Sequence, residues 1–353
     1  MINSYTGFQP LKEVWLGDTF DESWAAEIFD QPEHVQAFER ITQETRAQLD
    51  YFQSVLEADG IRVRRPHFPT RDAINFDEYA EFFTLNGDYR FRNYKQWFRD
   101  HRTAHCTKPQ LNPRDDFIVY GKTLYCVTPR SIATAWWRDT LNEYIANGYD
   151  VRFYDCGPLE GSMPPSVVRL GQDVILEDPG YPSPYSGQQT LARHFEAAGA
   201  RCRVVHSPDS RHADGQLSVL KPGLLLSSVG RQAIYNDTFP GWKVILAKEE
   251  WTGLSEEEKQ AVNDIRFQNQ EVYDQLKPWI GDITESFFDV NVLVRDPNHV
   301  YVINEPPQAA AEMLEAAEMT YTVIPWKYRW FWDGGLHCIT LDVERTGKGE
   351  TYV

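Results

Sequence analysis

The sequence has few of the features that mark exported, membrane-spanning or metal-binding proteins. Its five cysteines are scattered, odd in number and include no Cys-x-x-Cys pair, which argues against a disulfide framework and a cysteine-based zinc site. No apolar run approaches the roughly 20 residues that a membrane span needs. The amino-terminal segment has neither a basic start nor an apolar core, so we expect no secretory signal or transit peptide. These absences together favour a cytoplasmic protein.

Basic residues are also scarce. The chain of 353 residues has 35 Lys and Arg against 52 Asp and Glu, which gives a formal net charge of -17. Nucleic acids and anionic lipids bind through clustered basic side chains, so both are disfavoured as partners. A negative field attracts cationic small molecules, although acidity also serves solubility alone. We therefore expect a small-molecule partner, no nucleic acid and no membrane.

What the chain does contain is a recurring order of strand, turn, strand, helix and strand. With 42% hydrophobic residues it can bury a substantial core. The repeat is found at 117–155, 167–206, 217–247 and 290–326, and the third copy is degenerate. Lys221-Pro222-Gly223 in the third copy and Asp296-Pro297-Asn298 in the fourth are typical of tight turns between two strands.

The two ends of the chain can supply a fifth copy. A strand at 12–17 can pair with 337–344, while a helix at 38–60 leads to an exit strand at 61–66. Closing the ring in this way leaves few exposed sheet edges and brings the inner strand ends to a central axis, a natural place for a buried site. An open α/β sheet is the competing architecture, because it also alternates strands with helices.

We expect one domain over 1–353, interrupted by two long inserts near 66–112 and 250–285. Aromatic and charged residues are mixed there with little periodicity, which suits lids or walls of a site. The aromatic stretch of the first insert could suggest base stacking on nucleic acid. It lacks the basic surround that such binding needs, so a core or lid role is favoured.

A thiol near the carboxyl end stands in a segment suited to nucleophilic chemistry. Gly334 and Gly335 precede His337 and Cys338, so the backbone can pass close to a ligand beside the thiol. A single cysteine is more often a small buried hydrophobe. Residues elsewhere in the chain therefore decide between the two interpretations.

His212 and Asp214 stand two residues apart just before a predicted strand, and in extended backbone their side chains would face the same side. A carboxylate beside an imidazole orients it and raises its pKa, and an imidazole near a cysteine can hold the thiolate that attacks an electrophilic carbon. The His-x-Asp pattern alone is common in loops. No further ligands stand at a metal-binding spacing, so we expect no metal.

Six segments spread over most of the chain carry a family pattern. They read SYTGFQPLKEVWLG, NPRDDFIVYGKTLYC, VVRLGQDVIL, HADGQLSVLKPGLLLSS, VNVLVRD and GGLHCITLDVER. Together they resemble the arginine:glycine amidinotransferase-like family of the guanidino-group-modifying, or pentein, superfamily. The last segment is the most specific, being close to the GGGFHCxTxD pattern around the nucleophile of these amidinotransferases. The resemblance implies a five-bladed pseudo-symmetric α/β propeller with the active site on its axis, in agreement with the five repeats.

The resemblance also implies a role for each matching residue. Cys338 would take the amidino group from the donor, and His212 would protonate the leaving amine and deprotonate the incoming one. Asp214 would hold both the guanidinium and His212, and Asp115 would bind the guanidinium end of the substrate. Arg231, at the family's spacing from the catalytic histidine, would clamp the substrate α-carboxylate.

Two departures from the family pattern affect the substrate pocket. Met163 stands where the family usually has a carboxylate, and the nearby Glu160 can fill that role if 163–165 is a local insertion. Thr284 and Glu285 stand where the amidinotransferases carry paired serines, so the α-amino end of the substrate would be read differently. The identities of donor and acceptor therefore stay open.

The implied function is transfer of an amidino group from L-arginine, or a related donor, to a primary amine through a covalent amidino-cysteine. The thiol carries this reaction, so we expect no cofactor. Glu160-Gly161 resembles the start of a motif in hydrolytic relatives, which makes a deiminase or dihydrolase the alternative. A binding protein that has lost the chemistry is the third hypothesis, motivated by Met163 and Thr284-Glu285. A homodimer is the candidate assembly, because such dimers are common among soluble enzymes.

Overall fold

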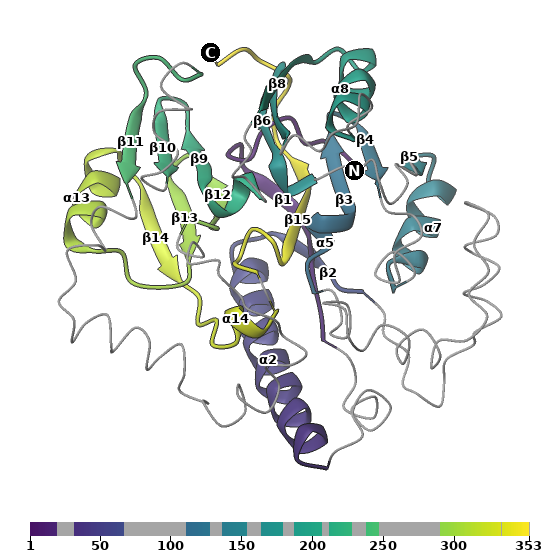
Figure 1. The fold of residues 1–353 in the computed structure, drawn as a ribbon, viewed down its shortest axis with the longest axis vertical. Helices are drawn as coiled ribbons and strands as arrows, with labels where there is room; N and C mark the ends of the chain where they lie inside the picture. The colour runs from purple at the N-terminus through teal and green to yellow at the C-terminus, as the bar shows by residue number, and fades with distance from the viewer. Residues whose placement is uncertain are drawn as a thin grey trace.

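The computed structural model describes residues 1–19, 32–66, 111–127, 136–153, 164–178, 187–206, 212–227, 238–246, 290–332 and 334–352. These residues form five three-stranded sheets, one for each predicted repeat (Figure 1). The five-bladed propeller is therefore confirmed, and the open sheet is wrong, because no strand pairs one sheet with the next in the described part of the chain.

Four of the sheets are each built from one continuous repeat. Their strands are β3 (Phe117–Tyr120), β4 (Thr123–Cys126), β5 (Asp150–Phe153), β6 (Val167–Leu170), β7 (Asp173–Asp178), β8 (Arg201–His206), β9 (Leu217–Lys221), β10 (Leu224–Ser227), β11 (Lys243–Leu246), β12 (Leu293–Asp296), β13 (His299–Val302) and β14 (Thr320–Val323). In each sheet the first two strands form an antiparallel hairpin, and the third strand lies parallel to the second.

A helical crossover accounts for that parallel third strand, because parallel neighbours cannot be joined by a tight turn. The crossovers include α7 (Arg138–Ala146), α8 (Gly187–Ala197) and α13 (Gln308–Ala316). The corresponding part of the third repeat, near 230–241, lies mostly outside the described residues.

The fifth sheet joins the two ends of the chain, as the repeats predict. β1 (Leu11–Leu16) pairs antiparallel with β15 (Thr340–Arg345) and parallel with β2 (Arg62–Arg64), while α2 (Pro32–Ala58) supplies the helix. β15 contacts β3 on one side and β1 contacts β12 on the other, which closes the ring.

The amino-terminal residues tie neighbouring sheets together. Gly121 and Gly171, at the β3–β4 and β6–β7 turns, have φ of +61° and +76°, values that glycine adopts without a Cβ clash. Their N–H groups donate to the carbonyls of Ser4 and Tyr5, each at 2.9 Å. Residues 1–7 therefore lie against two of the hairpin turns and connect these sheets to the fifth.

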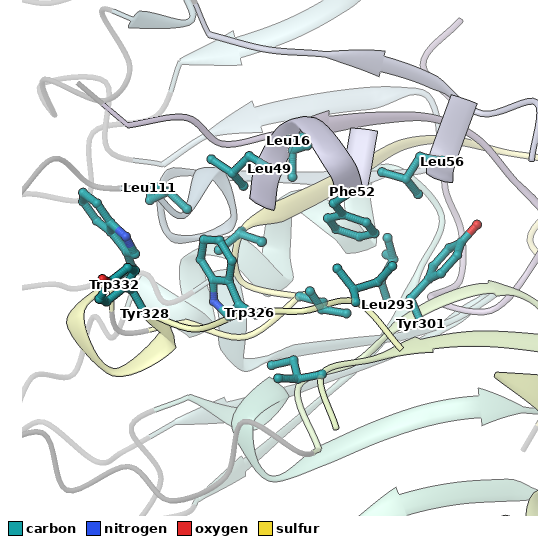
Figure 2. Close-up of a cluster of buried hydrophobic side chains, with 14 of the residues drawn as sticks. Leu16, Leu49, Phe52, Leu56, Leu111, Leu293, Tyr301, Trp326, Tyr328 and Trp332 are labelled. Carbon is teal, nitrogen blue, oxygen red and sulfur yellow. The ribbon is translucent and has the colours of Figure 1, made fainter. Parts of the chain in front are cut away.

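The hydrophobic core is divided into clusters that join neighbouring sheets. In one cluster α2 places Leu49, Phe52 and Leu56 against Leu293 of β12 and Tyr301 of β13 (Figure 2). The three helix residues recur at intervals of three and four, so they form one apolar stripe. Each such side chain contributes about 1.5–3 kcal/mol when fully buried. Clusters of this kind hold the sheets around the axis without continuous strand pairing.

Short helical turns precede several of the inner strands. They are α5 (Pro113–Asp116) before β3, η3 (Pro164–Ser166) before β6 and η4 (Ala213–Gly215) before β9. α5 contacts η3, η3 contacts η4, and α5 also contacts β15. A further short helix, α14 (Arg329–Trp332), precedes the segment that leads into β15. The amino-terminal ends of the inner strands therefore converge, as expected for a site on the axis.

The two predicted inserts lie largely outside the residues that the structure describes. The inserts predicted near 66–112 and 250–285 fall almost entirely outside the described residues, so their role as lids or walls stays a prediction. Within the described ranges, no helix combines the length and the apolar character that crossing a membrane requires.

Candidate active site

Cys338 lies in a turn at the point where the pre-strand turns converge. The sequence suggested that it belongs to the strand that pairs with β1, but β15 begins only at Thr340 and residues 336–339 form a turn. Nε of Arg114, from α5, donates to the carbonyls of His337 at 2.9 Å and Thr340 at 3.0 Å. Cys338 is 5% exposed and is carried by a turn that another sheet holds in place.

The two glycines before this turn allow neighbouring asparagines to approach it. A Cβ on Gly334 would lie 2.6 Å from Oδ1 of Asn112 and 3.0 Å from Cβ of Cys338. A Cβ on Gly335 would lie 2.7 Å from both Cβ and Oδ1 of Asn291. The Gly-Gly pair is therefore explained by close packing within the chain: the missing side chains leave room for two asparagine side chains beside the segment that carries the thiol.

Asn291, just before β12, makes several polar contacts with the turn. Its Oδ1 accepts hydrogen bonds from the N–H groups of His337 and Cys338, both at 2.9 Å. Its Nδ2 lies 2.9 Å from Sγ of Cys338 and 3.3 Å from the carbonyl oxygen of Asp214. One side chain thus connects the thiol, the turn that carries it and the η4 segment.

Asp214 also contacts the thiol. Its Oδ2 is 3.4 Å from Sγ of Cys338 and 2.7 Å from Nδ1 of His337. Its Oδ1 is buried and accepts no hydrogen bond from the part of the chain that the structure describes. A carboxylate oxygen with unused acceptor capacity beside a thiol is suited to bind an N–H donor of a substrate.

The charges around Asp214 keep it ionised. Burial alone would raise the pKa of Asp214, but the hydrogen bond from His337 and the positive charges of its neighbours, including Arg114, outweigh it and lower the pKa. Burial, followed by the charge of Arg114, lowers the pKa of His337. His337 is therefore neutral near pH 7 and donates its Nδ1 hydrogen to the carboxylate.

The backbone is extended at His212 itself, but the residues after it are not extended as expected. His212 has φ of -140° and ψ of 120°, but Ala213–Gly215 form a 3-10 turn that closes with a 2.9 Å bond from the N–H of Gln216 to the carbonyl of Ala213. The expected extended geometry at Asp214 is therefore wrong. The turn directs Asp214 to His337, while His212 is half-buried and close enough for its charge to lower the pKa of Asp214.

Asp115 belongs to the same region through Asn112. Asn112 precedes α5, whose first residue is Pro113, a favourable start for a helix. Nδ2 of Asn112 lies 3.5 Å from Oδ2 of Asp115, and its Oδ1 approaches Gly334. Asp115, the carboxylate predicted to bind the guanidinium, is therefore separated from the segment that carries Cys338 by the side chain of Asn112.

A buried ion cluster supports the site from β15. Nη2 of Arg169 lies 2.7 Å and 2.6 Å from the two carboxylate oxygens of Asp342, and Arg114 and Arg345 bind the same carboxylate at 2.8 Å and 2.6 Å. Burial raises the pKa of Asp342, but the three guanidinium groups hold it well below the ordinary value. Arg114 thus spans from this cluster to the cysteine turn.

A cavity of about 40 Å³ adjoins both the cluster and the site. Its lining includes Arg114, Arg169, Asp214 and His337, together with residues of the inner strands. A space of this size, lined in part by charged side chains, is large enough for a water molecule.

The structure brings together four of the predicted residues: Cys338, Asp214, His212 and, through Asn112, Asp115. The others lie outside the described residues, namely Arg231, Glu160, Thr284 and Glu285. Within the described part of the chain, no group of three or more His, Cys, Asp or Glu side chains could hold a metal ion.

Sequence reasoning assigned no role to Asn291, Arg114 or His337. One signal was present for Asn291, an amide between two valines at the start of an apolar strand segment. A polar residue in such a run is costly to bury unless it is hydrogen-bonded, so it marks a specific contact. Its partner, however, could not be read from the pattern.

No family model matches the chain. Inosamine-phosphate amidinotransferase 1 of Streptomyces glaucescens is 23% identical, and the match spans 100% of this chain and 99% of that protein. L-arginine:L-lysine amidinotransferase of Pseudomonas savastanoi pv. phaseolicola is 22% identical over 87% of this chain and 80% of its own. Among solved structures, SxtG, an amidinotransferase of the saxitoxin biosynthetic pathway of Microseira wollei, superposes with a TM-score of 0.68 at 21% identity, covering 100% of this chain and 99% of that chain.

Proposed function

Because the chain belongs to the amidinotransferase-like family of the pentein superfamily, we propose that it transfers an amidino group from L-arginine to a primary amine through a covalent amidino-cysteine at Cys338. One observation carries the choice of residues: Sγ of Cys338 lies 3.4 Å from a buried, ionised Asp214 whose Oδ1 accepts no hydrogen bond from the described residues. A planar cation held on that carboxylate would present its central carbon to the sulfur.

In the first half of the reaction, the sulfur electron pair forms a bond to the guanidinium carbon. The C–N bond to the departing amine then breaks, and His212 gives its proton to that nitrogen. Asp214 and Asp115 hold the positive charge of the guanidinium in place by position and charge. The products are the free amine, ornithine when the donor is arginine, and an amidino group bonded to Cys338.

In the second half, the nitrogen of a primary amine attacks the amidino carbon and loses a proton to His212. The C–S bond breaks, its electron pair returns to the sulfur, and a new guanidino compound leaves. If water attacked instead, the same intermediate would give a hydrolase. The relatives that span the chain are named as transferases, which supports the amine as the acceptor.

The remaining pocket residues are proposals from the family pattern. Arg231 would clamp the α-carboxylate of the donor in a two-point contact, and Glu160 would replace the family carboxylate at the guanidinium. Thr284 and Glu285 would contact the α-amino end. The inserts near 66–112 and 250–285 would cover the bound substrate within one domain. We further propose a cytoplasmic homodimer, which size-exclusion chromatography with light scattering would test.

The test is the intact mass of the wild-type protein after brief incubation with arginine and an acid quench, with and without a panel of amines. The panel contains glycine, lysine, a diamine and an amino-cyclitol phosphate. Without an amine, we expect the protein to gain one amidino group and to release one ornithine for each group gained. A particular amine should remove the group, and each new guanidino product should then be matched by one ornithine. Cys338→Ser should show no gain, whereas Cys202→Ala, which changes a half-buried cysteine of β8, should behave as wild type.

Other outcomes separate the alternatives. Citrulline formed without any amine would identify a hydrolase. Tight binding of arginine analogues with no adduct and no turnover would identify a binding protein and contradict the proposal.

A further inference from the structure

Asn291 is held in place independently of the thiol. It lies two residues before β12, is 1% exposed and is flanked by two valines. The N–H of Val292 donates to the carbonyl of Val290 at 2.9 Å, so the backbone makes a three-residue turn with Asn291 at its centre. Oγ of Ser218, from β9, donates to the same carbonyl at 2.6 Å. The side chain therefore projects from a backbone that two contacts fix.

The amide of Asn291 uses its full hydrogen-bonding capacity. Oδ1 accepts from two backbone N–H groups, and Nδ2 faces Sγ of Cys338 and the carbonyl of Asp214. An amide offers two lone pairs and two hydrogens, so none is left over. The reversed orientation would set its NH₂ against two donors and its oxygen against a carbonyl. The network thus determines that an N–H, and not the oxygen, faces the sulfur.

The sulfur lies between a donor and an anion. The carboxylate of Asp214, 3.4 Å away, disfavours a negative charge on Sγ, whereas the N–H of Asn291, at 2.9 Å, favours one. Hydrogen bonds to a charged acceptor are roughly twice as strong as those between neutral groups. Asn291 therefore stabilises the thiolate of Cys338 more than the thiol.

We propose that Asn291 is a catalytic residue that donates a hydrogen bond to the Cys338 thiolate before the attack and again when the sulfur is released. The inference rests on the proposed function. The sulfur loses its charge when the C–S bond forms and regains it when the incoming amine breaks that bond. The two N–H contacts of Oδ1 keep the turn, and hence the sulfur, in the same position at both moments.

The test measures the reactivity of the thiol and not turnover. Iodoacetamide, a neutral reagent, is reacted with the protein over about pH 5 to 10, and alkylation of Cys338 is followed by peptide mass. Two variants are compared. Asn291→Ala removes the N–H without adding charge, and Asn291→Asp keeps the oxygen that binds the turn. Gln188→Ala is the matched control, because it also removes a buried amide side chain, one that donates to the carbonyl of Glu177 at 3.0 Å beside a different sheet.

We expect the midpoint of the alkylation profile to rise by about one pH unit or more in both Asn291 variants, which is about tenfold slower reaction at neutral pH. Gln188→Ala should keep the wild-type midpoint. Should Asn291→Ala not fold, Asn291→Ser serves as the neutral variant. A rise in Asn291→Asp alone would reflect its added charge and would overturn the proposal, as would an unchanged midpoint in the neutral variant.

Failure of this inference is distinguishable from failure of the proposed function. Alkylation requires neither arginine nor an amine, so it reports on Asn291 even in a protein that transfers nothing. An amidino adduct on wild type together with an unchanged midpoint in the neutral variant would leave transfer intact and overturn only the role of Asn291.

Discussion

Nδ1 of His337 lies 2.7 Å from Oδ2 of Asp214, the carboxylate oxygen that also lies 3.4 Å from the thiol of Cys338. The neutral imidazole thus occupies one oxygen of the carboxylate, while Oδ1 accepts no hydrogen bond from the described residues. The histidine that directly precedes the nucleophile therefore orients the carboxylate that faces it.

Removing that hydrogen bond should impair substrate binding and attack. We expect His337→Ala to lower kcat/KM for arginine by about 10–100-fold, because one hydrogen bond to a charged group contributes about 1.5–3 kcal/mol. His337→Asn should recover most of the loss, since its Nδ2 can take the place of the imidazole Nδ1. Steady-state kinetics of ornithine release would measure both variants. Equal rates for wild type and His337→Ala would refute the orienting role.

The contact between Asp214 and the thiol predicts a preference for cationic reagents. In the free protein the thiol of Cys338 donates to the carboxylate, so a thiolate there meets a negative charge. A cation paired with Asp214 cancels that charge. We expect 2-chloroacetamidine to alkylate Cys338 at least about tenfold faster than 2-chloroacetamide, after correction for their rates with a small free thiol.

The same experiment has a pH dependence with a definite sign. Because the pKa of Asp214 is lowered below its ordinary value of 3.8, the carboxylate stays ionised through the neutral and mildly acidic range. The preference should therefore hold from neutral pH down to about pH 5, well above the ordinary pKa of an aspartate. Asp214→Asn should abolish it. A preference that survives this substitution would assign the effect to another anion.

Strand order and ring closure could be predicted from the sequence because they depend on local patterns. Turn residues between two apolar runs mark each hairpin: Gly121, Gly171 and Gly223 in three of them and Asp296-Pro297-Asn298 in the fourth. The pairing of 12–17 with the carboxyl-terminal strand follows from the need to complete a fifth sheet. The start of α2 at Pro32, before the expected 38, shows the usual weakness at element ends.

The contacts of the site could not be predicted in the same way. Asn291, Arg114 and Asp214 reach the turn that carries Cys338 from positions just before strands of three different sheets. No periodicity encodes which side chain beside one sheet reaches a turn of another. The spacing of His212 and Asp214 was visible, but it cannot distinguish extended backbone from the 3-10 turn that gives Asp214 a different imidazole partner. Only the closed ring supplies those distances.

The glycines beside the nucleophile give a steric prediction. A methyl group at Gly335 would lie 2.7 Å from Oδ1 of Asn291, so one of the two must move. We expect Gly335→Ala to lower the rate of amidino transfer at least about tenfold, because a displacement of about 1 Å at a reacting group is costly. Its melting temperature should fall only modestly.

Gly7→Ala is the matched control, because a Cβ at Gly7 meets nothing within 4 Å. Amidino transfer and melting temperature would be measured for both variants. Full activity in Gly335→Ala would show that Asn291 can shift without consequence for the sulfur.

The three arginines on Asp342 predict a buried charge whose loss is costly. Asp342→Asn would leave the guanidinium groups of Arg114, Arg169 and Arg345 without their common counter-ion. We expect the free energy of unfolding at pH 7 to fall by about 3–5 kcal/mol, the usual cost of removing one partner of a buried ion pair. Asp173→Asn is the control, because its pair with the exposed Arg201 should contribute about 1 kcal/mol or less.

The pH dependence of stability checks the same cluster. Since the pKa of Asp342 is held well below 3.8 in the folded protein, its stabilising effect is complete above that value and is lost as the pH falls through it toward the folded pKa. Urea unfolding between about pH 7 and 3 should therefore show wild type losing up to about 1.4 kcal/mol more per pH unit than Asp342→Asn at the acidic end. Parallel curves would mean that the carboxylate of Asp342 titrates at its ordinary pKa, and that the arginines are balanced by another anion.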